Sequence, residues 1–338
     1  MVANYAYVNA RVGGMRSLLF EESQYKALVE SASLEEAINF LKTTAYGKEL
    51  GKLASISLYD IEVALGRSVV EDYEKIVRSL RGEGKAFAER YAKKCELNTI
   101  KALVTLKFGG EKAGALIPYK ELSEAVIEKL LEMENLEELI ENLRFSEFYP
   151  VLKEAFSKFD GKIYTLTSAM DKYYYKKLYQ AMKELKGKDK IVEKLVGSEV
   201  DAKNLLLVLR LRGLSEEEVW NYLIPYKYKL KDDELRIFFN TTTIEEIISQ
   251  MPKNPYTDII INGLKEYEKT SSFLPLELEF EKYILSLNKK CFYGDRFHLG
   301  VPMAYLNLKE NEVKNIIAIL RGKEVNLPPS ELMESLIL

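Results

Sequence analysis

Apolar side chains recur at helical spacing along most of the chain. Across residues 59–80, for example, Ile61, Leu65, Val69 and Ile76 fall on one face of a helix. No segment alternates apolar and polar residues long enough between turn signals to predict a sheet. The pattern therefore predicts an all-α protein, with helices at residues 3–20, from 21, from 33, at 59–80 and 85–108, from 123, from 135 and at 165–186, and a longer loop at 289–308.

One stretch is apolar around its whole circumference. It reads DAKNLLLVLRLRG, from Asp201 to Gly213, with leucine or valine at every position from 205 to 211 except Arg210. A helix without a polar face is expected to be buried on all sides. Gly213, which follows Arg212, is expected to end this helix in the left-handed conformation.

The same stretch occurs three times. Near the C-terminus the chain reads ENEVKNIIAILRGK, near residue 100 it reads ELNTIKALVTLKFGG, and each copy runs into glycine. Recurrence at about a third of the chain length indicates an internal triplication. Aligning the copies places three polar positions in register, namely Asn98/Asp201/Glu312, Lys101/Asn204/Asn315 and Lys107/Arg210/Arg321.

Further markers repeat in the same order. Ser33, Asn135 and Thr243 each precede a glutamate by three residues, the pattern of a helix N-cap, and an aromatic residue follows each. We call the three copies of the repeated stretch the marker helices. An acidic residue followed by tyrosine precedes each of them, and Ile-Pro-Tyr-Lys follows the first two. We therefore predict three homologous helical bundles, which either stack openly or close around an approximate threefold axis with an axial cavity. Their expected boundaries are 1–115, 116–230 and 231–338.

Composition narrows the class of protein. The hydrophobic fraction of 47% and the charged fraction of 30% are typical of a folded soluble chain. A net charge of −3 argues against a protein that wraps nucleic acid. Two cysteines without metal-ligand spacing fit a reducing cytoplasm. Neither a signal peptide nor a membrane span is predicted, so any membrane contact is expected through partners.

Candidate chemistry is sparse. The single histidine, His298, has Asp295 nearby but lacks the three or four ligands of a metal site, so we interpret it as a surface or packing residue. No phosphate loop, dinucleotide fingerprint or nucleophile elbow occurs. Adjacent glutamates in the capping segments point about 100° apart on a helix, so they are interpreted as helix starts. No catalytic residue, metal or cofactor is expected.

The repeated polar residues form the candidate site. Each shares a helix with apolar neighbours and therefore requires a polar partner. They either tie helices together within each bundle or line a shared cavity or interface, and the residues alone leave both interpretations open. The candidate partner-contact residues are Asn98, Lys101, Lys107, Asp201, Asn204, Arg210, Glu312, Asn315 and Arg321.

Several stretches carry a family resemblance. They are YAYVNARVGGMRSLL, SLEEAINFLKTTAYGKEL, DAKNLLLVLRLRG with the following IPY, and the ENEVKNIIAILRGK ending. Together they resemble, over the whole chain, the C subunit of archaeal and bacterial V/A-type ATPases, whose eukaryotic counterpart is the d subunit of the AC39 family. The resemblance implies a funnel of three pseudo-threefold helical domains with no active site. It also implies a place on the cytoplasmic face of the rotating proteolipid ring, with the central axle, made by the D and F subunits, entering the open mouth.

This resemblance implies a peripheral coupling protein, present once per complex and monomeric when isolated, for proton or sodium transport linked to ATP synthesis or hydrolysis. A soluble helical-repeat scaffold is the alternative. A third possible class is an enzyme. An enzyme requires a cluster of titratable side chains, and the sequence shows none. Because the contact faces of such a coupler must remain soluble when the protein is free, we expect them to be polar and sensitive to salt.

Overall fold

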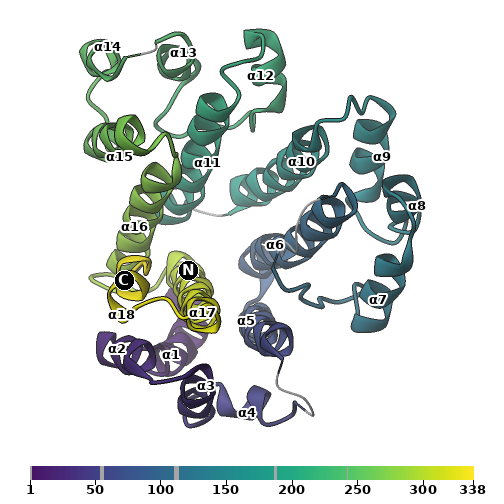
Figure 1. Cartoon of the computed structure of the whole chain (residues 1–338), viewed down its shortest axis with the longest axis vertical. Helices are drawn as coiled ribbons and strands as arrows, with labels where there is room; N and C mark the ends of the chain where they lie inside the picture. The colour runs from purple at the N-terminus through teal and green to yellow at the C-terminus, as the bar shows by residue number, and fades with distance from the viewer. Residues whose placement is uncertain (1, 54–56, 110–113, 186–188, 242) are drawn as a thin grey trace.

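The computed structural model describes residues 2–53, 57–109, 114–185, 189–241 and 243–338, and Figure 1 shows that they form an assembly of helices. These residues contain no strand, and their only β-type pairing is one isolated bridge between Tyr119 and Leu122. The predicted all-α class is confirmed.

Two kinds of helix alternate along the chain. The long helices are α1 (Val2–Arg16), α5 (Leu58–Ser79), α6 (Gly82–Lys107), α10 (Ile163–Glu184), α11 (Lys190–Arg210), α15 (Thr257–Thr270), α16 (Leu274–Lys290) and α17 (Gly300–Glu324). The short helices are α2 (Glu22–Glu30), α3 (Leu34–Lys42), α4 (Gly47–Leu50), α7 (Glu124–Glu132), α8 (Leu136–Glu141), α9 (Tyr149–Ser157), α12 (Glu216–Tyr222), α13 (Asp232–Asn240), α14 (Ile244–Gln250) and α18 (Pro329–Glu334).

The repeated capping signals begin helices as predicted. The side chains of Ser33, Asn135 and Thr243 accept hydrogen bonds from the backbone N–H groups of the glutamates three residues later. Each cap satisfies an N–H that the first turn of a helix leaves without a partner. The glutamate pairs therefore serve as helix starts, and the expected short helices α3, α8 and α14 follow them.

The left-handed helix end predicted at Gly213 is not formed, and the glycines of the three copies differ from one another. Gly109 takes a left-handed conformation with φ +99°, whereas Gly213 does not, and Gly322 lies inside α17. A β-carbon at Gly322 would lie 2.2 Å from a side-chain carbon of Leu332, so close packing explains this glycine. The loop expected at 289–308 is also shorter, because α17 already begins at Gly300.

Helices from distant parts of the sequence pack together. The last long helix, α17, packs against α5, α1, α3 and α2, so the end of the chain joins its beginning (Figure 1). In the same way α6 packs against α8 and α10, and α11 packs against α13 and α16. The marker helices α6 and α11 therefore each pack beside a short helix of the following sequence repeat, and α17 packs beside short helices of the first.

Two cores of buried apolar side chains result from this packing. One runs from Val8 to Leu336 and includes α17 together with the helices of the first two thirds of the chain. The other is confined to residues 202–280 and fills the group formed by α11 to α16. Because the first core contains residues from both ends of the chain, the first and third sequence repeats share one packed interior.

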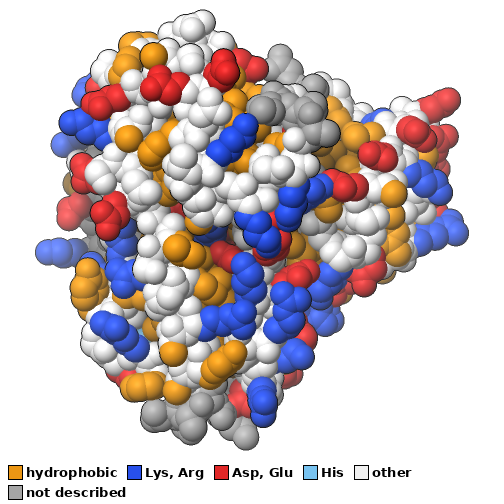
Figure 2. Space-filling model, turned by 90° about the horizontal axis from the view of Figure 1, so that it is seen from below, with side chains coloured by type: hydrophobic (Ala, Val, Ile, Leu, Met, Phe, Trp, Pro, Cys, Tyr) orange, Lys and Arg blue, Asp and Glu red, His pale blue; other side chains and the backbone are white. Residues whose placement is uncertain are grey.

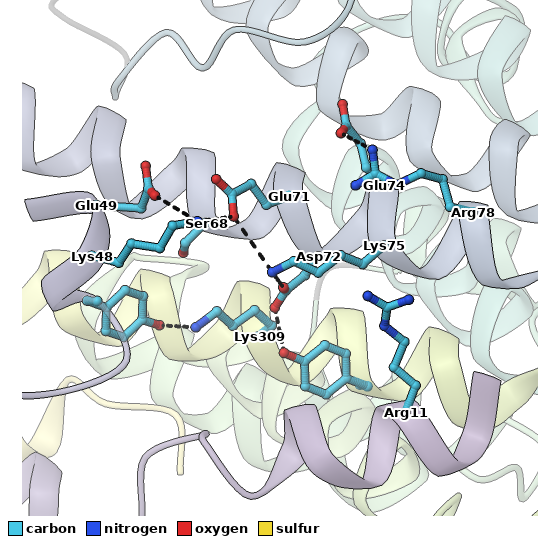
Figure 3. Close-up of polar contacts among 12 residues, drawn as sticks. Arg11, Lys48, Glu49, Ser68, Glu71, Asp72, Glu74, Lys75, Arg78 and Lys309 are labelled. Carbon is cyan, nitrogen blue, oxygen red and sulfur yellow. Dashed lines mark hydrogen bonds and ion pairs between the residues drawn. The ribbon is translucent and has the colours of Figure 1, made fainter. Parts of the chain in front are cut away.

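Buried polar groups connect α17 to the first group of helices. Lys309 donates a 2.7 Å hydrogen bond to the hydroxyl of Tyr46 and lies 3.1 Å from Glu312, while Tyr305 donates to Asp72. Figure 3 shows Lys309 and Asp72 pointing into the space between α17 and α5. Burial, with the Glu312 carboxylate beside it, holds the pKa of Tyr46 well above its usual range, so the hydroxyl stays a hydrogen-bond donor.

Candidate functional site: a central cavity between the repeated helices

A cavity of 620 Å³ lies where the three marker helices meet. Its walls are α6, α11 and α17, together with α10, α16 and the segment after α11. One helix from each sequence repeat therefore contributes to the same concave surface. The polar marker residues that line it are Asn98, Lys101, Asn204 and Arg210.

The marker helices are joined at one point of the cavity by a three-membered ion cluster. Lys94 of α6 lies 3.6 Å from a carboxylate oxygen of Glu199 on α11 and 3.0 Å from one of Glu310 on α17. Tyr175 donates to Glu199 at 2.7 Å, and Tyr73 donates to Glu310 at 2.6 Å. Each of the three helices thus supplies one charged residue to a largely buried junction.

The charges in this junction support one another. Burial alone would lower the pKa of the Lys94 ammonium, but Glu199 and Glu310 outweigh it and hold that pKa well above its usual range. Burial likewise opposes ionisation of Glu199, and Lys94 with Lys203 nevertheless holds its pKa below the usual value. Lys94 and Glu199 are therefore both charged across the neutral range, and removal of the single lysine would leave two carboxylates without their common partner.

Further ion pairs lie along the cavity walls. Lys101 of α6 donates to Asp171 of α10 at 2.7 Å, and Lys314 of α17 lies 3.5 Å from Glu281 of α16. Arg210 of α11 pairs with Glu277 of α16. Figure 2 shows a similar mixture on an outer face of the molecule, where basic and acidic side chains are intermingled.

The most buried candidates act inside the helix groups. Asp201 accepts hydrogen bonds from the backbone N–H groups of residues 228–230 and from Tyr256, at 2.6 to 3.2 Å. Asn204 and Asn315 bond in both directions to the backbone, at Ile224 and Ile337 respectively. Such contacts tie a chain segment to a helix and satisfy buried polar groups.

Contacts in the structure correct the alignment of the first repeat by two residues. Glu312 accepts from Tyr46 and Asp201 accepts from Tyr256, but in the first copy the buried acid is Glu96, which accepts from Ser146 at 2.6 Å. Asn98, which the sequence alignment places with these acids, lines the cavity instead. In the same way, Thr99 donates to the backbone carbonyl of Ile117, so Thr99 and not Lys101 is the counterpart of Asn204 and Asn315.

The three aligned basic residues, Lys107, Arg210 and Arg321, make different contacts. Lys107 donates to the carbonyls of Leu131 and Met133 at the end of α7, both at 2.6 Å. Lys323, not Arg321, does the same for Val29 and Ser31 at the end of α2. Arg321 instead makes a bidentate pair with Glu62 of α5. Of the three aligned basic residues, only Arg210 lies on the cavity wall, so they do not line one shared surface.

Sequence reasoning missed the ion cluster itself. With the corrected alignment, Lys94, Glu199 and Glu310 occupy the same position of the three copies, two residues before the buried acids. Opposite charges at equivalent positions could have indicated a contact between repeats, but only after the alignment had been shifted.

Neither a metal-binding cluster nor a membrane-spanning helix occurs in the part of the chain that the structure describes. Within those ranges, no group of three or more His, Cys, Asp or Glu side chains is arranged to hold a metal ion. None of the helices in the described residues is long and apolar enough to cross a membrane.

Comparison with known proteins identifies the family of this chain. Residues 8–335 match the profile of the family described as ATP synthase (C/AC39) subunit. The chain belongs to this family. It is 32% identical to the C subunit of the A-type ATP synthase of Methanocaldococcus jannaschii, with 99% of this chain and 87% of the relative covered. The protein of the same name from Methanosphaera stadtmanae is 28% identical, with 98% and 88% covered, and that from Methanosarcina barkeri is 29% identical, with 99% and 93% covered.

Membership of the family defines the class of protein. The chain is a subunit of an A/V-type ATPase, a complex of ATP synthesis and ion transport. It is a structural member of that complex and not one of its catalytic subunits.

Proposed function

We propose that this chain is the central-stalk coupling subunit of a rotary A/V-type ATPase. In this role it joins the axle, made by the D and F subunits, to the proteolipid ring in the membrane and passes torque between them. It would lie peripherally on the cytoplasmic face, held there by the complex, with one copy per assembly.

The observation that carries this proposal is the central cavity with one wall from each repeated helix. A helix with its side chains is about 10–12 Å across and rises about 1.5 Å per residue, so 620 Å³ holds roughly one helical turn. A cavity of this size suits the end of a helical axle that is seated at a junction of three helix groups.

Transmission of torque also requires a stiff body. The closure of α17 onto the first helices and the Lys94–Glu199–Glu310 cluster connect helices from all three repeats. Packed interiors resist compression and transmit strain, which supports a role as a rigid link.

Affinity purification from detergent-solubilised membranes tests the proposal. The tagged chain is expected to retain axle subunits and the proteolipid ring together. A soluble helical-repeat scaffold, the alternative function, would retain neither and would instead retain partners from the soluble fraction. Recovery of only soluble partners, with the intact ATPase left in the unbound fraction, would reject the coupling role.

A further inference from the structure

The cavity has an apolar side and a polar side. Leu206 and Leu207 of α11, Leu211 directly after it and Ile284 of α16 line one side, and each is only partly buried. A helix buried on all sides was expected here, but this leucine face of α11 opens into the cavity. We call these four residues the leucine wall.

The residues that α6 and α17 contribute to the cavity are all polar. On this side, Asn98 and Lys101 come from α6, Asp171 comes from α10, and Asn311 and Lys314 come from α17. The charged groups among them already have partners within the walls, since Lys101 pairs with Asp171 and Lys314 with Glu281. We call this side the polar wall.

The leucine wall breaks the equivalence of the three repeats. In the corrected alignment, Leu206 and Leu207 correspond to Lys101 and Ala102 on α6 and to Ile317 and Ala318 on α17. Ala102 and Ile317 pack against the main core, outside the residues that line the cavity. Among the three marker helices, only α11 therefore offers an apolar surface to an inserted segment.

We propose that the cavity holds its partner helix in a single rotational orientation, with an apolar face against the leucine wall and a polar face toward α6 and α17. This inference rests on the proposed function and concerns how the same cavity recognises the axle. The partner chemistry is that of an amphipathic helix end. Such a segment matches both walls at once, because apolar groups gain by leaving water and polar groups lose unless they remain hydrogen-bonded.

The inserted helix is fixed in one orientation because any other orientation brings apolar side chains against the polar wall and polar side chains against the leucine wall. Turning the inserted helix by a third of a revolution would place its apolar face on Lys101 or Asn311 and bring polar groups against Leu206 and Leu207. A threefold-equivalent socket would have three equally favourable seats. The asymmetric socket has one, so the axle cannot slip between seats under load.

Site-specific photocrosslinking in the assembled ATPase tests the orientation. The probe is p-benzoylphenylalanine, placed in separate samples at Leu207 on the leucine wall and at Asn311 on the polar wall. Mass spectrometry then identifies the crosslinked axle residues. The two probes are expected to mark opposite faces of one helical segment. A probe at Leu18, a leucine after α1 that is 62% exposed and outside the cavity, is expected to mark no axle residue.

A matched pair of variants tests the energetics. The double variant Leu206→Gln/Leu207→Gln is expected to bind the axle about a hundredfold more weakly, roughly tenfold for each half-buried leucine. Leu18→Gln makes the same chemical change outside the cavity and is expected to leave the affinity unchanged. Circular dichroism and a melting curve of each variant check that the fold is retained.

The outcomes separate this inference from the proposed function. If the unmodified chain retains no axle, the proposed function fails and this inference fails with it. If the axle is retained but both probes mark the same face, or the double variant binds normally, only the inference is overturned. A dimer of the isolated chain that the double variant abolishes would assign the leucine wall to a second copy, which also overturns it.

Discussion

Replacing Lys94 by methionine tests the ion cluster that joins the three repeats. Methionine keeps most of the length and the apolar stem of lysine but removes the ammonium group. Glu199 and Glu310 then share a junction with no cation between them, 3.6 and 3.0 Å from where the lysine nitrogen stood.

The expected cost follows from burial. Removing one partner of a fully buried ion pair costs about 3–5 kcal/mol. The side chains of Lys94, Glu199 and Glu310 are 19%, 19% and 20% exposed, so water screens part of the effect. We expect Lys94→Met to lower the free energy of unfolding by about 2–3 kcal/mol at pH 7.5.

The sign of the pH dependence follows from Glu199. Its pKa is held low in the folded chain, so it contributes stability that is present above the unfolded value of about 4.3 and is lost as pH falls through the folded value. Without Lys94, the burial that raises this pKa acts with less opposition, and the folded carboxyl gains from protonation. The difference in stability between parent and variant should therefore narrow as the pH is lowered from about 7.5 to about 4.5.

Urea unfolding of the purified chain at several pH values measures these quantities. Lys85→Met is the matched control, because it is the same change on α6 at an exposed pair 3.9 Å from Glu89, and it should cost at most about 0.5 kcal/mol. Adding Glu310→Gln to Lys94→Met should recover part of the loss. A variant within about 0.5 kcal/mol of the parent, or a gap that widens on acidification, would refute the role given to the cluster.

Three further predictions use other contacts in the structure. Asp201→Ala should lower the free energy of unfolding by about 2–4 kcal/mol, since residues 228–230 lose their acceptor, whereas exposed Glu217→Ala should be neutral in the same urea titration. Among Lys107→Ala, Arg210→Ala and Arg321→Ala, the change at Arg321 should cost most, roughly 1–3 kcal/mol by thermal melting, because it leaves buried Glu62 unpaired. The change at Arg210, which is 52% exposed, should cost at most about 1 kcal/mol, and equal effects at all three positions would contradict this ranking. Raising the salt concentration several-fold should slow association with the axle, measured by biolayer interferometry, but should leave a salt-resistant component of affinity from the leucine wall, and complete loss of binding in salt would argue for a purely polar interface.

Much of the fold could be predicted from local signals. Ser33, Asn135 and Thr243 cap helices because their side-chain oxygens satisfy backbone N–H groups within the same few residues. Helical periodicity likewise predicts α5 and α10 to within two residues of their ends. Such features depend on neighbours in sequence, which one chain shows directly.

The site depended on information that the sequence does not display. The sequence alignment of the first repeat is two residues late because the first copy has Thr99 where the other copies have Asn204 and Asn315, so the pattern of an acid followed by asparagine three residues later is lost after Glu96. Lys94 and Glu199 do not stand out in the sequence because a contact between repeats appears only when three distant helices come together. The face of α11 that lines the cavity was interpreted as core from the sequence, because the same apolar residue types occur in a cavity wall and in a packed interior.

A comparison of ATP hydrolysis with ion transport tests whether this chain couples the two activities. The ATPase is reconstituted into sealed vesicles with this chain, without it, and with the Leu206→Gln/Leu207→Gln variant, and both activities are measured on each sample. A coupling role predicts that ATP-driven ion transport is lost without the chain and reduced with the variant, while the catalytic sector still hydrolyses ATP. Ion transport that proceeds at the full rate without the chain would contradict the account.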